Sequence, residues 1–390
     1  MFVVDREASH AADQRMKVHV WMPDYVSAMG GIQALSRFLV RALRECLPDA
    51  EIVVFTKNDR SVPDPEENTV TRFSTVGWWA PSQRTAAFTV ELLRCAVRER
   101  PDLIITTHVN FTPIAHWLKK SFKIPFIALG HGVEVWQIQS IRVRRALRSA
   151  DRLLAVSEFT RKRMANALSI SSNAIEMLPN TFDMQKFELG PKPHFLLKRY
   201  GLRHDQPVIL TVARLSSVEQ YKGYDQVLRA LPAVKRVLPD VRYILGGRGP
   251  DRSRVLQLIS ELGVTDSVIL AGYIPDYELS SFYNLCDVFA MPSRGEGFGI
   301  VFLEALACGK PVIAGNTDGS VDAALNGRLG VLVDPGNVDE ISMALMQVLS
   351  KRRPLQILKQ PDALRSGVIN AYGYKRFVER VREIIQPFVD

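Results

Sequence analysis

The residues with the clearest chemical potential are two glutamates, Glu296 and Glu304, placed on either side of a glycine-rich turn. Gly295, Gly297 and Gly299 allow the backbone to turn sharply and to approach a ligand closely. The helical pattern that follows offers unpaired backbone N–H groups and a positive dipole end, which together bind anions. Glu304 would lie about 7–8 Å further along that helix. The spacing predicts a nucleotide site, with phosphates at the helix end, ribose at Glu304 and another part of the ligand at Glu296.

Two cations are expected near the same site. Arg214 follows a predicted strand at 207–212, and Lys222 comes shortly afterwards, just before a helical run. Ligands of parallel α/β sheets bind beyond the carboxyl ends of the strands, so both side chains should face the site. A diphosphate leaving group needs positive charge nearby as its bond breaks. The alternative is that both residues are ordinary surface cations; their position after a strand favours the site.

Three other turns have weaker signals. Gly246 and Gly247 follow a predicted strand at 241–245, and Gly30 and Gly31 lie between a predicted strand at 17–21 and a predicted helix at 32–43. His131 lies between two glycines after a predicted strand at 124–129. Loops at this edge of a sheet often bind ligands. A plain glycine loop and a structural histidine remain the alternative interpretations.

Short apolar segments alternate with helical segments in both halves of the chain, which is typical of doubly wound parallel sheets. The 390 residues, 47% of them hydrophobic, are too many for one ordinary core. We predict an α/β protein with two doubly wound Rossmann-like domains facing across a cleft. The expected divisions are a flexible leader (1–16), an N-terminal domain (17–185), a linker (186–205), a C-terminal domain (206–370) and a final helix (371–390) packing back on the N-terminal domain. Further strands are predicted at 51–55, 101–106, 152–156, 268–271, 288–291, 311–314 and 330–333.

Cysteine usage and hydropathy indicate the compartment. None of the four cysteines forms a CxxC pair, which predicts reduced, apolar side chains. No run of eighteen apolar residues predicts a spanning helix. The first fifteen residues lack the basic and apolar regions of a signal peptide. A cytoplasmic location is expected.

The net charge of +9 is concentrated in the first half, where residues 101–163 hold 11 Lys and Arg against 4 Asp and Glu. The alternatives are a solvated basic face and attraction to phosphates or anionic lipid. The segments 116–123 (HWLKKSFK) and 141–148 (IRVRRALR) favour peripheral contact with the inner face of the plasma membrane. Nucleic-acid binding is not favoured, because aromatic-plus-basic recognition motifs are missing from the sequence.

Taken together, these segments resemble the retaining glycosyltransferases of family 4, which have the GT-B fold. The similarity covers roughly 17–350, and the Glu296–Glu304 spacing is its most specific part. After Ile313 the family often has a Gly-Gly pair followed by a Glu. Here Asp318 takes one Gly position and Asp322 the Glu position, so the resemblance leaves the donor undefined. The matching segments are 30–32, 131–134, 156–158, 178–180, 212–215 with 222–223, 246–250, 271–274 and 292–313.

The resemblance implies a role for each candidate residue. The donor diphosphate would bind Arg214 and Lys222, and the ribose would bind Glu304. The sugar hydroxyls would bind Glu296, and His131 would contact the sugar near the reacting centre. These roles make His131, Glu296, Arg214 and Lys222 the catalytic candidates, and no metal or other cofactor is implied. The remaining donor contacts would come from Gly30, Gly31, Gly246, Gly247, Ile274 beside the base, Gly297, the backbone of Phe298 and Gly299, and Ile300.

The predicted function is transfer of a hexosyl unit from GDP-mannose or a UDP-hexose to a saccharide or polyprenyl-diphosphate-linked acceptor, with retention of configuration. Such a reaction fits the assembly of cell-surface polysaccharide, lipopolysaccharide or glycolipid. The alternatives are a non-catalytic sugar-nucleotide-binding subunit and an epimerase of the same fold.

Overall fold

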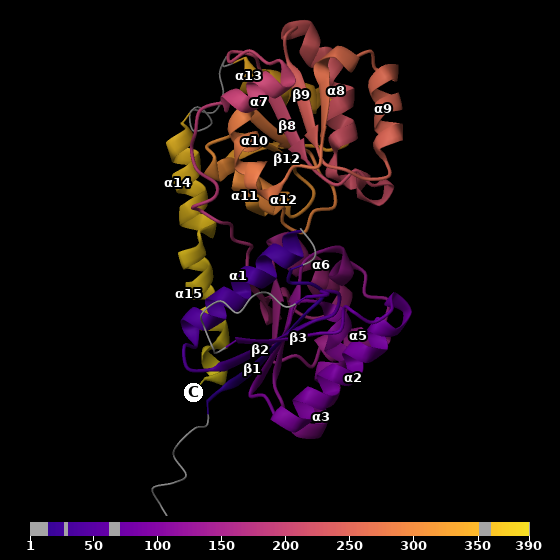
Figure 1. Ribbon diagram of the computed structural model, residues 1–390, viewed down its shortest axis with the longest axis vertical. Helices are drawn as coiled ribbons and strands as arrows, with labels where there is room; N and C mark the ends of the chain where they lie inside the picture. Colours follow the sequence, from indigo (N-terminus) through magenta and orange to yellow (C-terminus); the bar gives the residue numbers. More distant parts are fainter. Residues whose placement is uncertain (1–14, 27–29, 62–70, 351–359, 390) are drawn as a thin grey trace, which may run out of the picture.

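Two parallel β-sheets, one in each half of the chain, form the framework of the protein (Figure 1). The computed structural model describes residues 15–26, 30–61, 71–350 and 360–389. The N-terminal sheet has seven strands in the order β3-β2-β1-β4-β5-β6-β7. Its strands are β1 (Lys17–Met22), β2 (Glu51–Thr56), β3 (Thr71–Thr75), β4 (Leu103–Thr106), β5 (Phe126–Gly130), β6 (Arg152–Ala155) and β7 (Ile175–Met177).

The C-terminal sheet has six strands in the order β10-β9-β8-β11-β12-β13, and all of its neighbouring strands are parallel. In both sheets the strand order reverses beside the first strand of that half, as expected for doubly wound sheets. The predicted fold class is therefore confirmed. The strands are β8 (Val208–Val212), β9 (Arg242–Gly246), β10 (Val268–Gly272), β11 (Val288–Met291), β12 (Val312–Gly315) and β13 (Gly330–Val333).

Helices connect the strands of the N-terminal sheet, and α2 and α3 cover one face of it (Figure 1). Central strands such as β4 and β5 are buried along their whole length, which explains their continuous apolar sequence. The helices of this half are α1 (Gly31–Cys46), α2 (Pro81–Glu99), α3 (Thr112–Phe122), α4 (Val133–Trp136), α5 (Ile141–Leu147) and α6 (Glu158–Leu168), with short 3-10 turns η1 (Val109–Phe111) and η2 (Ser172–Ala174).

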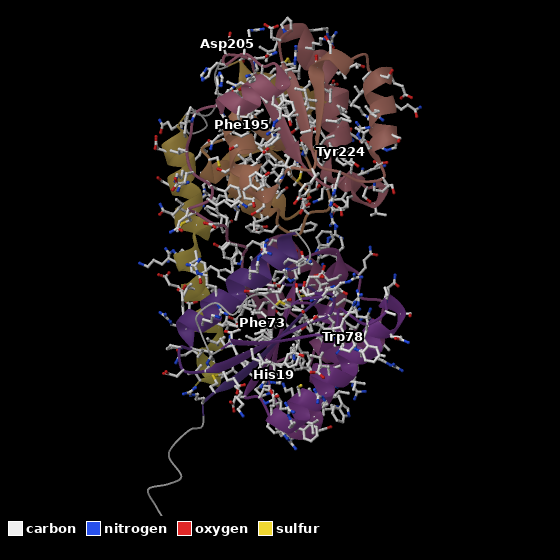
Figure 2. The ribbon with its side chains drawn as sticks, in the orientation of Figure 1. His19, Phe73, Trp78, Phe195, Asp205 and Tyr224 are labelled. Carbon is white, nitrogen blue, oxygen red and sulfur yellow. The ribbon has the colours of Figure 1, made fainter. Side chains whose placement is uncertain are left out.

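The second half repeats this arrangement around its own buried core. Tyr224 at the start of α8 and His19 on β1 lie inside the two halves, and neither side chain is exposed (Figure 2). The helices are α7 (His194–Tyr200), α8 (Tyr224–Val237), α9 (Arg252–Glu261), α10 (Leu279–Leu285), α11 (Ile300–Ala307), α12 (Ser320–Ala323) and α13 (Val338–Leu349), with 3-10 turns η3 (Ser217–Lys222), η4 (Thr265–Ser267) and η5 (Asp276–Glu278).

The last two long helices, α14 (Pro361–Tyr372) and α15 (Tyr374–Ile385), run along one side of both halves (Figure 1). α14 packs on α11, and α15 packs on α1. The chain then ends in a 3-10 turn, η7 (Gln386–Phe388). Arg365 on α14 donates hydrogen bonds to the carbonyl oxygens of Met184 and Ala307 at 3.0 and 2.8 Å. These bonds join the segment around Met184, which connects the two halves, to the C-terminal half.

Two of the predicted chain divisions lie at the N-terminus and between the two halves. The leader predicted at 1–16 lies almost entirely outside the described residues. The segment 186–205 predicted as a linker contains the helix α7, which ends at Tyr200 and is followed by Gly201 in a left-handed conformation (φ 62°). Leu196 and Leu197 of this helix are buried, so that part of the segment packs on the C-terminal half.

Candidate active site

The carboxyl ends of the two sheets meet at a junction between the halves. On the N-terminal side the junction consists of His131–Gly132 and 158–160, and on the C-terminal side of Glu296–Gly297 and Asp322. The Thr160 hydroxyl donates to the Gly297 carbonyl at 3.2 Å, and the Glu158 N–H donates to Asp322 at 3.2 Å. The turns that carry the predicted site residues of both halves are thus in direct contact.

Gly297 lies where the two backbones approach most closely. A Cβ added at Gly297 would lie 1.7 Å from the His131 carbonyl oxygen, a distance that no real side chain can adopt. Gly299 has a φ of 86°, in the left-handed region that favours glycine, and it directly precedes α11. The glycines therefore have specific roles. Gly297 permits the halves to touch, and Gly299 sets the turn that presents the N-terminus of α11.

Glu296 forms an ion pair with Lys222, which lies at the end of η3. Their side chains are only 14% and 18% exposed. Burial is the largest single influence and would lower the pKa of Lys222, but the charge and hydrogen bond of Glu296, together with Tyr221 and Glu219, outweigh it and the pKa is raised. The structure thus places a protonated lysine and a carboxylate side by side at the junction. A bound ligand could replace this ion pair, with an anionic group of the ligand at Lys222 and its hydroxyl groups at Glu296.

Glu304 lies on α11, half-buried, and accepts a hydrogen bond of 2.7 Å from the Tyr283 hydroxyl. Burial raises the pKa of Glu304 to about 7, and the Tyr283 bond only partly opposes this shift. A carboxyl group that titrates near neutral pH can accept hydrogen bonds from vicinal hydroxyls once it is ionised.

Arg214 differs from Lys222 in being open to solvent. Its side chain is 75% exposed and pairs with Glu219 at 2.8 Å. The second carboxylate oxygen of Glu219 is buried and has no hydrogen-bond partner. An exposed guanidinium on a surface pair is free to reorient at little cost.

Two other predicted donor turns pack on each other. Gly246 ends β9 and contacts the Ile274 side chain so closely that a Cβ would lie 2.3 Å from it. Gly247 packs equally closely on the Ala213 carbonyl. The glycines thus bring the loop after β9, the loop after β8 and the turn after β10 together, and Ile274 itself is 8% exposed.

His131 is buried on the N-terminal side of the junction. Its Nε2 lies 2.8 Å from the Thr107 carbonyl oxygen, which can only accept, so Nε2 carries the proton. Burial lowers the pKa of His131, although Glu134 opposes the shift, and the ring is neutral. Glu134 also accepts from the Gly132 N–H at 3.1 Å, which orients this turn. His131 therefore presents Nδ1 as an acceptor.

Gly30 and Gly31 occupy the start of α1, as their sequence position predicts. Gly30 has extended backbone, and a Cβ there would approach only the flexible end of the Gln33 side chain, at 2.7 Å; a Cβ added at Gly31 would meet nothing within 4 Å. Neither residue is therefore required by packing in the described structure. Their predicted approach to a phosphate or sugar stays a prediction.

Sequence reasoning missed two residues beside these turns. His108 follows β4, and its pKa is lowered, first by burial and then by Lys57, while Glu134 raises it. Its place after a buried strand is the signal that could have identified it. Asp318 was noticed only as a departure from the family pattern, yet its carboxylate accepts from the Glu296 N–H at 2.8 Å.

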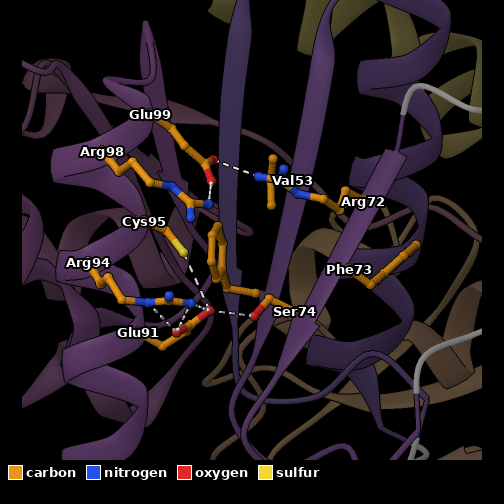
Figure 3. A pocket seen from close by; sticks show the side chains of 10 residues that line it. Val53, Arg72, Phe73, Ser74, Glu91, Arg94, Cys95, Arg98 and Glu99 are labelled. Atoms are coloured by element: carbon orange, nitrogen blue, oxygen red, sulfur yellow. Dashed lines mark hydrogen bonds and ion pairs between the residues drawn. The ribbon is translucent and has the colours of Figure 1, made fainter.

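A separate charged region lies on α2 and the neighbouring strands (Figure 3). A hollow of about 230 Å³ is lined there by Arg72, Arg98 and Glu99, among others. Arg72 and Arg98 both pair with Glu99, at 2.6 and 2.7 Å, and Glu99 also contacts the buried His19 ring at 3.1 Å. These charges stabilise one another, and none of the predicted site residues is among them.

A second hollow, of about 800 Å³, lies beside the start of α2 and is lined by Trp78 and Trp79. Trp78 is 67% exposed. This hollow also lacks any of the predicted site residues.

Family models match both halves of the chain. The model of glycosyltransferase family 4 matches residues 29–186, and the model of glycosyl transferases group 1 matches residues 195–364. The chain belongs to this glycosyltransferase family. The two matches account for most of the protein and cover every residue proposed for the site, in agreement with the resemblance inferred from the motifs.

Two relatives of this glycosyltransferase are mannosyltransferases by description. The GDP-mannose-dependent alpha-(1-6)-phosphatidylinositol monomannoside mannosyltransferase of Mycolicibacterium smegmatis is 38% identical over 239 residues, which are 58% of this chain and 61% of that enzyme. The corresponding monoacylated-acceptor enzyme of Corynebacterium glutamicum is 28% identical over 93% of this chain and 96% of its own. The chain thus matches less than two thirds of the length of the M. smegmatis enzyme.

Solved structures support the fold. Sucrose-phosphate synthase from Thermosynechococcus elongatus matches with a TM-score of 0.79 and 20% identity over 96% of this chain and 99% of that chain. Anabaena Alr3699/HepE in complex with UDP matches with a TM-score of 0.77 and 19% identity over 95% and 100%. At these identities the likeness establishes the GT-B fold and nothing more. Among the described residues, no helix is long and apolar enough to cross a membrane.

Proposed function

We propose that this glycosyltransferase transfers mannose from GDP-mannose to a lipid-linked acceptor with retention of configuration. The Lys222–Glu296 pair at the junction carries the proposal, because it offers a cation for the diphosphate and a carboxylate for the sugar in adjacent positions. The activities of the Mycolicibacterium and Corynebacterium relatives favour GDP-mannose and a phosphatidylinositol mannoside acceptor. A UDP-hexose donor is the competing choice.

In the proposed reaction the acceptor hydroxyl attacks the anomeric carbon on the face from which the diphosphate leaves. The new C–O bond forms as the bond to phosphate breaks, and the acceptor proton passes to the leaving phosphate oxygen. Lys222 and Arg214 neutralise the charge that develops on the diphosphate. Glu296 holds the sugar hydroxyls, Glu304 holds the ribose and neutral His131 accepts a hydrogen bond from the sugar. No protein nucleophile and no metal take part.

The test of donor and acceptor uses the purified full chain. Among GDP-mannose, UDP-glucose, GDP and UDP, GDP-mannose should raise the unfolding temperature more than UDP-glucose does. A ligand at 100 times its Kd raises the free energy of unfolding by roughly 2.7 kcal/mol. Incubation with phosphatidylinositol monomannoside should then yield an α-linked product by NMR. Donor binding without transfer to any acceptor would favour a non-catalytic subunit, and conversion of the donor sugar without acceptor would favour an epimerase.

We also propose that α3 and α5 contact an anionic membrane. The two helices pack together and expose Trp117 (48%) and Ile141 (71%) beside cations. Lys120, Arg142 and Arg145 are exposed as well. Each basic residue near the surface contributes about 1 kcal/mol, so the combined effect is measurable.

The test for membrane contact is sedimentation with liposomes of anionic or neutral phospholipid at low salt. The triple variant Lys120→Ala/Arg142→Ala/Arg145→Ala should bind anionic liposomes at least tenfold more weakly than the wild type. The matched control changes three exposed arginines of the other half, Arg229, Arg236 and Arg252, to alanine. Equal losses in both triple variants, or no binding of the wild type, would remove this proposal.

A further inference from the structure

The buried carboxylate of Asp318 has no role in the predicted site. It lies between β12 and α12 and is 1% exposed. One oxygen accepts from the Ser293 hydroxyl and from the Glu296 N–H, both at 2.8 Å. The other accepts from the Ser320 N–H at 3.0 Å and from the Ser320 hydroxyl. Four donors, two of them backbone groups, therefore converge on a single buried side chain.

The contacts fix the turn that carries Glu296 from both sides. While Asp318 accepts from the Glu296 N–H, the next residue, Gly319, donates its own N–H to the Glu296 carbonyl at 2.9 Å. A Cβ at Gly319 would lie 2.1 Å from the Gly297 carbonyl oxygen, so the two turns are in close contact. The peptide groups on both sides of the Glu296 Cα are thus held, in a turn whose glycines would otherwise leave it mobile.

We propose that Asp318 is a positioning residue for the sugar part of the donor, acting through Glu296. The inference rests on the proposed role of Glu296 in binding the sugar. A carboxylate held in one place by an anchored backbone recognises hydroxyls at lower entropic cost than a freely moving one. The nucleoside diphosphate, by contrast, is proposed to bind Arg214, Lys222 and Glu304, and the hydrogen bonds of Asp318 go to none of these three. Asp318 should therefore affect recognition of the sugar and leave recognition of the nucleoside diphosphate unchanged.

Substitution of Asp318 with asparagine separates these effects. The asparagine side chain would have one acceptor oxygen and one NH₂ group, so one of the two backbone N–H groups would lose its acceptor and face a donor. Serine hydroxyls can rotate, but backbone N–H groups cannot. We expect Asp318→Asn to fold and to bind nucleoside diphosphate within about twofold of the wild type. The extra affinity that the sugar provides should fall about tenfold, as for loss of one buried charge-assisted hydrogen bond.

The measurement is isothermal titration with GDP and GDP-mannose, or with UDP and UDP-glucose if these bind more tightly. The matched control is Asp334→Asn, an exposed aspartate in the loop after β13 that accepts from the Gly336 N–H at 2.7 Å. Its ratio of nucleotide to nucleotide-sugar affinity should equal that of the wild type. An equal loss for both ligands in Asp318→Asn, or a ratio unchanged from the wild type, would overturn the inference.

A double variant distinguishes failure of this inference from failure of the proposed function. If Asp318 acts through Glu296, Asp318→Asn should add no further loss of sugar affinity to Glu296→Gln, whereas independent effects would add. Additive losses would overturn the inference and leave the proposed role of Glu296 intact. If Glu296→Gln alone left sugar affinity unchanged, the proposed function of the turn would itself be wrong.

Discussion

At the scale of single residues, the predicted donor contacts differ in their readiness to bind. Lys222 and Glu296 are paired and shielded from solvent, and Arg214 forms an exposed pair with Glu219. Glu304 is held by Tyr283 in surroundings that favour its neutral form. Binding a ribose through Glu304 therefore requires ionisation of a carboxyl group whose pKa is about 7. Burial lowers the pKa of His131, so this histidine stays neutral over the same range.

The pKa of Glu304 predicts a pH dependence of donor affinity. The ionised form accepts hydrogen bonds from the ribose, so the Kd for GDP-mannose should rise as the pH falls from 8 through about 7 to 6. The charge of Lys186 lowers this pKa and that of Asp276 raises it, so the two oppose each other. Glu304→Gln should bind the donor about 10- to 100-fold more weakly and without this pH dependence. Isothermal titration at pH 6, 7 and 8 measures both the affinity for the donor and its change with pH. The same change of Kd with pH in the wild type and the variant would contradict the role of Glu304.

At the scale of elements, the junction depends on turns that lack side chains. The loop after β5 and the turn before α11 touch only because Gly297 has no Cβ, whereas a Cβ at Gly132 would make an ordinary contact of 3.5 Å with the Gly297 Cα. Asp322 joins the same junction by accepting from the first backbone N–H of α6, which is unpaired within the helix. Asp322, which stands where the family often has a Glu, thus caps a helix of the other half.

Gly297→Ala should separate the halves. Its Cβ would overlap the His131 carbonyl, and a displacement near 1 Å at a reacting centre costs about 100-fold in rate. GDP affinity should change less than threefold, because Arg214, Lys222 and Glu304, which are proposed to bind the nucleoside diphosphate, all lie in the C-terminal half. Gly336→Ala is the control, since its Cβ would meet only the Asp334 side chain, at 3.3 Å. Steady-state turnover and GDP titration are measured for both variants. Normal turnover in Gly297→Ala would contradict the claim that the close contact between Gly297 and His131 is needed for the reaction.

Elements with a strong apolar pattern were predictable, and those without one were not. The predicted strands at 51–55, 268–271 and 288–291 match β2, β10 and β11 to within one residue. β3 was missed because it is a partly exposed edge strand with a polar sequence, and β7 because it has only three residues. The Glu296–Glu304 spacing indicated the turn and helix correctly. The Lys222–Glu296 and Asp322–Glu158 contacts were beyond sequence reasoning, because residues 74 and 164 positions apart meet only through tertiary packing.

At the scale of the whole molecule, stability in acid depends on a charge cluster remote from the junction. His19 is fully buried and contacts Glu99, which also pairs with Arg72 and Arg98. Hydrogen bonding to His19 is the main cause that lowers the pKa of Glu99, from 4.5 to about 2. Burial lowers the pKa of His19 below 6.5. Both folded-state pKa values are depressed, so each group stabilises the fold above its unfolded pKa.

The free energy of unfolding should therefore fall on acidification. The contribution of neutral His19 is lost as the pH falls below 6.5, and that of Glu99 is lost between about 4.5 and 2. Glu99→Gln should be less stable at pH 7, and the difference from the wild type should shrink toward pH 3. Urea unfolding at pH 7, 5 and 3 measures this. A difference that is constant with pH would show that Glu99 contributes no ionisation-dependent stability.

The most direct measurement is donor-saturation kinetics of the wild type, Lys222→Ala and Lys235→Ala with GDP-mannose and phosphatidylinositol monomannoside. Lys235 is the matched control, a lysine paired with Asp266 at 2.6 Å in the same half. If Lys222 neutralises the leaving diphosphate, Lys222→Ala should lower kcat by about 10²–10³ while Lys235→Ala stays at the wild-type value. Thermal unfolding of each variant shows that the fold is intact. Wild-type kcat and KM in a folded Lys222→Ala would contradict nucleotide-sugar transfer at this junction.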